Sequence, residues 1–222
     1  MARQHACVVG LVALALSAAA TARAADGDIS SVMSSISVNA GENRGNLSTV
    51  NGSIRVGEGA TVGHAHTVNG SITLESRATA AEATTVNGSV HLNDGAHVNG
   101  PVHSVNGSLA LAQGAEVSGM LANVNGSIRV GAAHVGGDVE TVTGSIEIGP
   151  DAHVDGGVIV RKDHSDETGS REEPKVVIGP GSVVKGPLKF ERPVKLYVSD
   201  RARTGAIEGA TPTTFSGQKP AE

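Results

Sequence analysis

The sequence is poor in cysteine and in aromatic residues. Its single cysteine is Cys7, it has no tryptophan, and its only Phe and Tyr residues are Phe190, Tyr197 and Phe215. One cysteine cannot form an intrachain disulfide, so packing and hydrogen bonds must hold the fold together. Sites for sugars or single-stranded nucleic acid usually use aromatic platforms, and the residues before Phe190 offer none.

Positive charge is also scarce. The chain has 17 Lys and Arg against 22 Asp and Glu, a net charge of −5. This balance argues against nucleic acid or an anionic membrane as a partner. The apolar run from Ala6 to Ala20 is shorter than the roughly 20 residues that span a bilayer. We therefore expect no transmembrane segment and no nucleic-acid partner.

The first 24 residues have the pattern of a secretory signal peptide. A basic start with Arg3 precedes the apolar run, and Ala22 and Ala24 form an Ala-x-Ala cleavage site. Ala25 follows where a lipoprotein would need cysteine, so we expect a soluble product. Its 15 basic and 22 acidic residues give a net charge of −7. The predicted location is the periplasm or the cell exterior.

An internal repeat dominates the rest of the chain. A Thr-Val-Asn-Gly-Ser-Ile-like motif starts at residues 31, 49, 67, 85, 104, 123 and 141, with a period of 18 and two steps of 19. A second motif, as in Glu58-Gly-Ala-Thr-Val-Gly63, lies between the copies. Val, Ile, Leu or Ala recurs every six residues through both motifs from Val32 to Val160, with one extra residue before Val105 and another before Val124. Arg44 and Gly136 are the exceptions.

This pattern predicts an all-β fold, a single-stranded parallel β-helix with three sides and about 18 residues per turn. We expect the residues of the six-residue frame to point inward, and Gly and Asn to form the corners because they tolerate positive φ. Stacked turns would place the asparagines of the first motif in one row, hydrogen-bonded from turn to turn. This predicted ladder consists of Asn51, Asn69, Asn87, Asn106 and Asn125.

Asn-Gly between apolar residues is also a strong hairpin signal, so an array of antiparallel hairpins is the alternative fold. Hairpins would not explain the six-residue frame in the second motif. We therefore favour the β-helix.

The predicted boundaries follow the frame. Residues 28–161 form the repeat region, 162–175 a charged loop, 176–209 further turns, and 210–222 a tail. The frame resumes after the loop at Ile178, Val184, Phe190, Leu196 and Ala202.

The C-terminal turns resemble the end of a bactofilin domain. The resemblance rests on Val176-Val-Ile-Gly-Pro-Gly-Ser-Val-Val-Lys-Gly186, Val194-Lys-Leu-Tyr-Val198 and Ala202-Arg-Thr-Gly-Ala-Ile-Glu-Gly209, and it covers residues 130–217 best. It implies a right-handed triangular β-helix that polymerises end to end without nucleotide. The Asn-Gly repeats are also similar to secreted β-strand-repeat proteins described as putative adhesins. Bactofilins are usually cytoplasmic or attached to the inner membrane, whereas this chain has an export signal.

The histidines are the only candidates for metal chemistry. His97, His134 and His153 occupy one slot of the second motif, which Glu116 also occupies. A metal site needs three or more convergent ligands, so we expect solvated side chains and no metal or cofactor. The six-residue frame is similar to that of hexapeptide acyltransferases and related carbonic anhydrases, but the histidine spacing does not match theirs.

We therefore expect a non-enzymatic structural protein of the cell envelope that forms homo-oligomers or polymers through its ends. The aromatic residues near the C-terminus, Phe215, Phe190 and Tyr197, are the predicted self-association contacts, and capping of the core is their other interpretation. The alternative function is a monomeric adhesin or envelope-binding module, with cell-wall or surface polysaccharide as its partner. A metal-dependent enzyme of the hexapeptide type is the third hypothesis.

Overall fold

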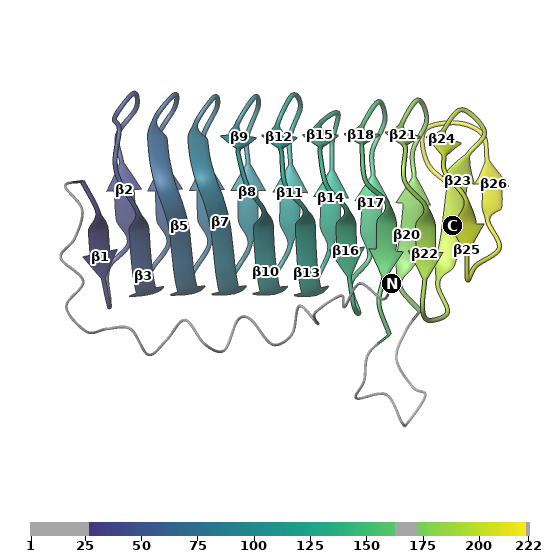
Figure 1. The fold of residues 1–222 in the computed structure, drawn as a ribbon, viewed down its shortest axis with the longest axis horizontal. Helices are drawn as coiled ribbons and strands as arrows, with labels where there is room; N and C mark the ends of the chain where they lie inside the picture. Colours follow the sequence, from purple (N-terminus) through teal and green to yellow (C-terminus); the bar gives the residue numbers. More distant parts are fainter. Residues whose placement is uncertain (1–26, 163–172, 221–222) are drawn as a thin grey trace, which may run out of the picture.

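The computed structural model describes residues 27–162 and 173–220, which form a parallel β-helix of about nine turns (Figure 1). This confirms the predicted fold class. The predicted signal peptide, residues 1–24, lies outside the described residues, as does most of the predicted charged loop. Within the described residues, no helix is long and apolar enough to cross a membrane.

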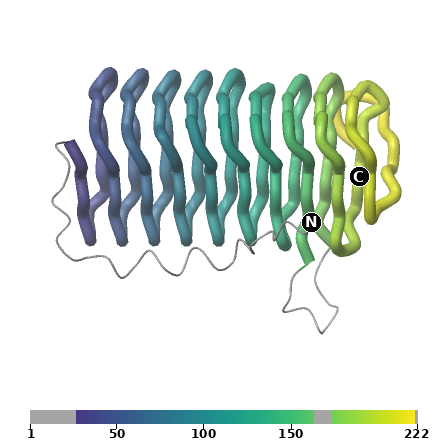
Figure 2. The backbone as a smooth tube through the Cα atoms, viewed as in Figure 1, coloured from purple at the N-terminus to yellow at the C-terminus, as the bar shows by residue number. Residues whose placement is uncertain are grey.

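The turns lie side by side along the long axis (Figure 2), and their strands form three rows. Row 1 contains β1 (Ile29–Ser31), β3 (Leu47–Asn51), β5 (Thr61–Asn69), β7 (Thr79–Asn87), β10 (Val102–Asn106), β13 (Leu121–Asn125), β16 (Val139–Thr141), β19 (Val158–Val160), β22 (Leu188–Phe190) and β25 (Ile207–Glu208). Row 2 contains β2 (Ile36–Val38), β4 (Ile54–Val56), β6 (Ile72–Leu74), β8 (Val90–Leu92), β11 (Leu109–Leu111), β14 (Ile128–Val130), β17 (Ile146–Ile148), β20 (Lys175–Ile178), β23 (Lys195–Ser199) and β26 (Thr213–Phe215). Row 3 contains β9 (His97–Val98), β12 (Glu116–Val117), β15 (His134–Val135), β18 (His153–Val154), β21 (Val183–Val184) and β24 (Arg203–Thr204).

Every strand pairs in parallel with its counterpart in the next turn. Ile36 pairs with Ile54, 18 residues on, and Val90 pairs with Leu109, 19 residues on. The alternative array of antiparallel hairpins is therefore wrong. Rows 1 and 3 form one sheet because the long strands β5 and β7 run through both.

The core is a column of small and branched side chains, two from each side of each turn. One turn contributes Ile54 and Val56, Ala60 and Val62, and Ala65 and Thr67, each at most 4% exposed. Aliphatic side chains stacked in this way bury the apolar face that a single turn would expose to water.

The prediction that the whole six-residue frame points inward is wrong at one position in three. The valines next to the asparagine ladder are only half-buried: Val50, Val68, Val86, Val105, Val124 and Val142. Side chains alternate along a strand, and in β3 Leu47 and Thr49 take the inward places, so Val50 points outward. Gly136 departs from the six-residue frame for a similar reason. The residue before it, Val135, takes the inward position and pairs with the buried Val117 of the preceding turn.

The two kinds of corner use glycine for different reasons. In the second motif Gly59, Gly95 and Gly114 have φ between +65° and +69°, as predicted. In the Asn-Gly corners most glycines have ordinary φ, so that part of the prediction is wrong. A Cβ on Gly70 would lie 2.0 Å from the carbonyl oxygen of Gly52 in the preceding turn. Close stacking, not positive φ, requires glycine there.

After the loop the frame returns to the core, since Ile178, Val184, Phe190 and Leu196 are buried. The boundaries differ slightly from those predicted. Lys175 begins β20 instead of ending the loop, and the predicted tail contains a strand, β26, that pairs with β23. The β-helix thus extends to Phe215.

Candidate functional site: the ends of the rod

The five asparagines of the predicted ladder lie in one row along a corner. Each amide nitrogen donates to the side-chain oxygen of the asparagine in the preceding turn, at 2.9 to 3.0 Å, from Asn125 back to Asn51. The Thr143 hydroxyl donates to Asn125 and continues the row. These bonds join neighbouring turns, so the ladder is part of the scaffold.

A second ladder, inside the corner, was missed by the sequence analysis. Thr67 and Thr85 are fully buried, and their hydroxyls donate to the carbonyl oxygens of Gly52 and Gly70 at 2.8 and 2.9 Å. The same position holds Thr49, Ser104, Asn123 and Thr141. The hydroxyl residue two places before Asn51, Asn69, Asn87 and Asn106 was the available signal.

On row 3 three of the candidate metal ligands, His97, Glu116 and His134, lie within contact of one another. Glu116 lies 3.3 Å from Nδ1 of His97 and 3.6 Å from Nδ1 of His134. Asp155 lies 3.1 Å from Nε2 of His134 and 2.7 Å from Nζ of Lys185. Hydrogen bonds from Lys185 and His134 hold the pKa of Asp155 below its usual value.

A shallow hollow of about 440 Å³ on the side of the rod is bordered by Glu116, His134, His153, Asp155 and Lys185. In residues 27–162 and 173–220 no group of three or more His, Cys, Asp or Glu is arranged to hold a metal ion. These groups contact one another from turn to turn along the row, so the arrangement ties successive turns together.

Row 1 carries a set of partly buried polar groups that the sequence analysis did not single out. Burial lowers the pKa of His66 and of His103, and the carboxylate of Glu82 opposes part of this shift in both. Further along the row Glu140 is buried and accepts two hydrogen bonds from Arg161, at 2.7 and 3.0 Å. Arg161 also lies 3.5 Å from Glu191.

The three predicted self-association residues occupy different environments. Phe190 is only 5% exposed and belongs to the hydrophobic core. Tyr197 lies in the outward column of row 2, with the Lys175 amine 5.3 Å from its ring centre. Phe215 is half-buried on β26, the last strand, and of the three it alone lies at the end of the rod.

Both ends of the described rod expose strand edges. At the N-terminal end β1 and β2 each pair with a strand on one side only. At the other end β24, β25 and β26 likewise have one neighbour each (Figure 1). Backbone donors and acceptors on such an edge can pair with another chain.

Comparisons with family models, with curated proteins and with solved structures find no match to this chain.

The N-terminal end carries exposed apolar side chains. Val32 and Met33, directly after β1, are 64% and 82% exposed, and they are the large hydrophobic residues most exposed within the described part of the chain. The C-terminal end has a hollow of about 460 Å³ that is lined by apolar residues, Phe190, Pro193, Val194 and Ala210, and by polar ones, Glu191, Arg192 and Thr211. Apolar surface at the ends is suited to contact with another protein surface.

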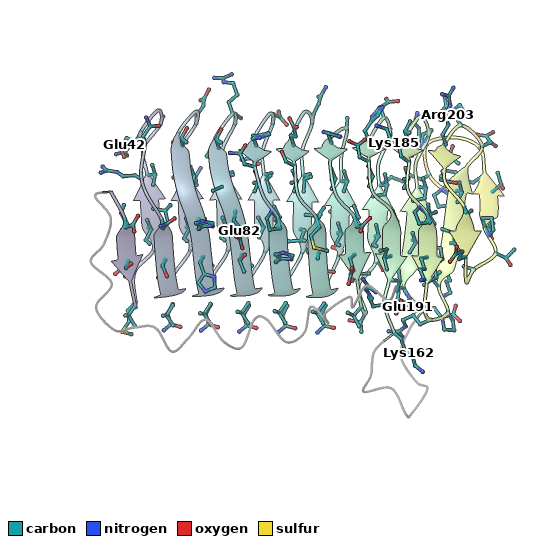
Figure 3. The ribbon with its side chains drawn as sticks, in the orientation of Figure 1. Glu42, Glu82, Lys162, Lys185, Glu191 and Arg203 are labelled. Carbon is teal, nitrogen blue, oxygen red and sulfur yellow. The ribbon has the colours of Figure 1, made fainter. Side chains whose placement is uncertain are left out.

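Charge is distributed unevenly along the rod. Residues 27–162 contain 12 Asp and Glu against 6 Lys and Arg, whereas residues 173–220 contain 4 against 8. Figure 3 shows Glu42 near one end and Arg203 near the other. The C-terminal part is therefore basic and the rest of the rod acidic.

Proposed function

We propose that this chain is a non-enzymatic structural protein of the cell envelope that associates with copies of itself through the ends of its β-helix. The observation that supports this most directly is the pair of strand edges, β1 and β2 at one end and β24 to β26 at the other. A copy stacked on either end would continue the ladder and satisfy backbone groups that otherwise face water.

The sequence supports the other parts of the proposal. The signal-peptide pattern of residues 1–24 favours export to the periplasm or beyond, and the bactofilin-like C-terminal motifs favour polymerisation. The polar groups of the described side faces are largely engaged in ladders and ion pairs between turns. The partner in this proposal is therefore the protein itself, with no cofactor.

The test is the state of association of the purified protein. The full-length gene is expressed, the processed N-terminus is read by mass spectrometry, and the product is studied by light scattering and negative-stain electron microscopy. We expect rods or filaments longer than one molecule that lengthen with concentration. A wild-type protein that remains monomeric at high concentration would refute the proposal.

Phe215 provides a test at a single residue. Phe215→Arg places a charge on the terminal strand edge and is expected to shorten or abolish the assemblies while circular dichroism still reports the β-helix. Tyr197→Arg, one turn earlier on the side face, is the matched control and should assemble normally. Binding of a monomeric wild type to peptidoglycan or surface polysaccharide would instead favour the adhesin hypothesis.

A further inference from the structure

The exposed residues Val32 and Met33 and the C-terminal hollow follow strands of the same row. Ile29 of β1 lies at one end of a continuous column of paired residues, and Ile207 of β25 lies at the other. Val32 and Met33 follow β1 directly, and Gly209, Ala210 and Thr211 follow β25 directly. The exposed pair and the hollow therefore occupy the same corner of the rod.

A second copy that continues the register would bring these features together. Its β1 would lie over β25, with Ile29 over Ile207, and both of these residues are only partly buried in the single chain. Its β2 would lie over β26, since Ser37 and Thr213 end a second continuous column. Val32 and Met33 would then lie over Ala210 and Thr211, beside the hollow.

The direction of the strands and the charge of the ends favour the same orientation. All pairs in the rod are parallel, and only a head-to-tail stack extends both rows with parallel pairs. Residues 188–217 carry five Lys and Arg against three acids, while residues 27–62 carry three acids against two Arg. Head-to-tail contact joins ends of opposite net charge, whereas tail-to-tail contact joins two basic ends.

We propose that Val32 and Met33 of one copy dock against the C-terminal hollow of the next, so that the assembly is a polar, head-to-tail stack. In this contact the Met33 side chain meets a hollow lined by the apolar residues Pro193, Val194 and Ala210 and by the charged residues Glu191 and Arg192. This inference depends on the proposed end-to-end association and adds its polarity and its contact residues. A heterologous contact of this kind leaves one free end of each type, and the stack can grow without limit.

In the experiment, each of the two contact surfaces is blocked in a separate variant, and the two purified variants are then mixed. Met33→Arg blocks the exposed pair, and Thr211→Arg blocks the rim of the hollow. Both residues are exposed, so the variants should fold as the wild type does by circular dichroism. Ala110→Glu, on the side of the rod, is the control and should assemble like wild type.

We expect each blocked variant to be a monomer by mass photometry and an equimolar mixture to form one-to-one dimers and nothing longer. The dimer forms because the mixture still contains one intact surface of each kind. Homodimers of Met33→Arg alone would show tail-to-tail contact and overturn the inference. Normal filaments from both variants would also overturn it, while leaving end-to-end association intact. A monomeric wild type would instead refute the proposed function itself.

Discussion

The side-chain hydroxyl of Thr67 lies 2.8 Å from the carbonyl oxygen of Gly52, to which it donates a hydrogen bond from within the core. Thr67 is fully buried, and Gly52 belongs to the Asn-Gly corner of the preceding turn. The bond therefore links the corners of two successive turns. It does so from inside the core, where most of the other inward-pointing side chains are aliphatic.

Removing this hydroxyl should weaken the stacking of turns. Thr67→Val keeps the shape of the side chain but leaves the Gly52 carbonyl without this donor, which should lower the free energy of unfolding by about 1–2 kcal/mol. Urea unfolding followed by circular dichroism measures the change. Thr61→Val, at an exposed site in the same strand, should change it by less than about 0.5 kcal/mol. Equal effects of the two substitutions would contradict the assigned role of the inner ladder.

The same ladder contains a position that can be improved. Asn123 is buried and donates to Gly107, but its side-chain oxygen is a buried acceptor with no hydrogen-bond partner among the described residues. Asn123→Thr removes that oxygen and restores the residue found at Thr67 and Thr85. We expect the free energy of unfolding to rise by about 1 kcal/mol. An unchanged or lower urea midpoint would argue against this explanation.

The two kinds of corner glycine should respond differently to the same substitution. Gly70→Ala places a Cβ 2.0 Å from the Gly52 carbonyl oxygen, so neighbouring turns must separate, at a cost above about 3 kcal/mol. Gly59→Ala has open space around it and pays only for φ of +65°, about 1 kcal/mol. Thermal or urea unfolding of the pair measures the difference, and equal losses would contradict the distinction.

The ion pair between the buried Glu140 and the partly exposed Arg161 should be costly to break from one side. Arg161→Leu leaves a buried carboxylate without its two hydrogen bonds, and we expect a loss of about 2–3 kcal/mol in unfolding free energy. The double variant Glu140→Leu/Arg161→Leu removes the stranded charge and should recover much of this loss. A double variant less stable than the single one would show that the pair itself stabilises the fold.

Stability should fall on mild acidification because of His103. Burial holds the pKa of His103 below its usual value, so between this pKa and the ordinary value of about 6.5 the unfolded chain binds the extra proton. The contribution of His103 is therefore fully present above about pH 6.5 and is lost as the pH falls towards the lowered pKa. His103→Gln should reduce the drop in urea midpoint between about pH 7.5 and pH 5.5. His91→Gln, at an exposed site, is the control, and an unchanged profile for His103→Gln would refute the assignment.

The sequence by itself determined the fold class, because a period of 18 built from six-residue steps can bury its valines only if successive turns stack. It also predicted the asparagine row, since identical residues one turn apart must be neighbours in a register that repeats. These features depend on local spacing alone, and spacing is visible in the chain.

The tertiary structure decided which side chains line the axis and what the ends expose. Thr49 and Val50 are adjacent, and only the alternation imposed by the packed strand turns the threonine inward and the valine outward. Phe190 and Phe215 look alike in the sequence, yet one is in the core and the other on the last strand. The match between Met33 and the hollow beside Thr211 joins residues almost a full chain apart, and only the register accumulated over all the turns places them in one corner.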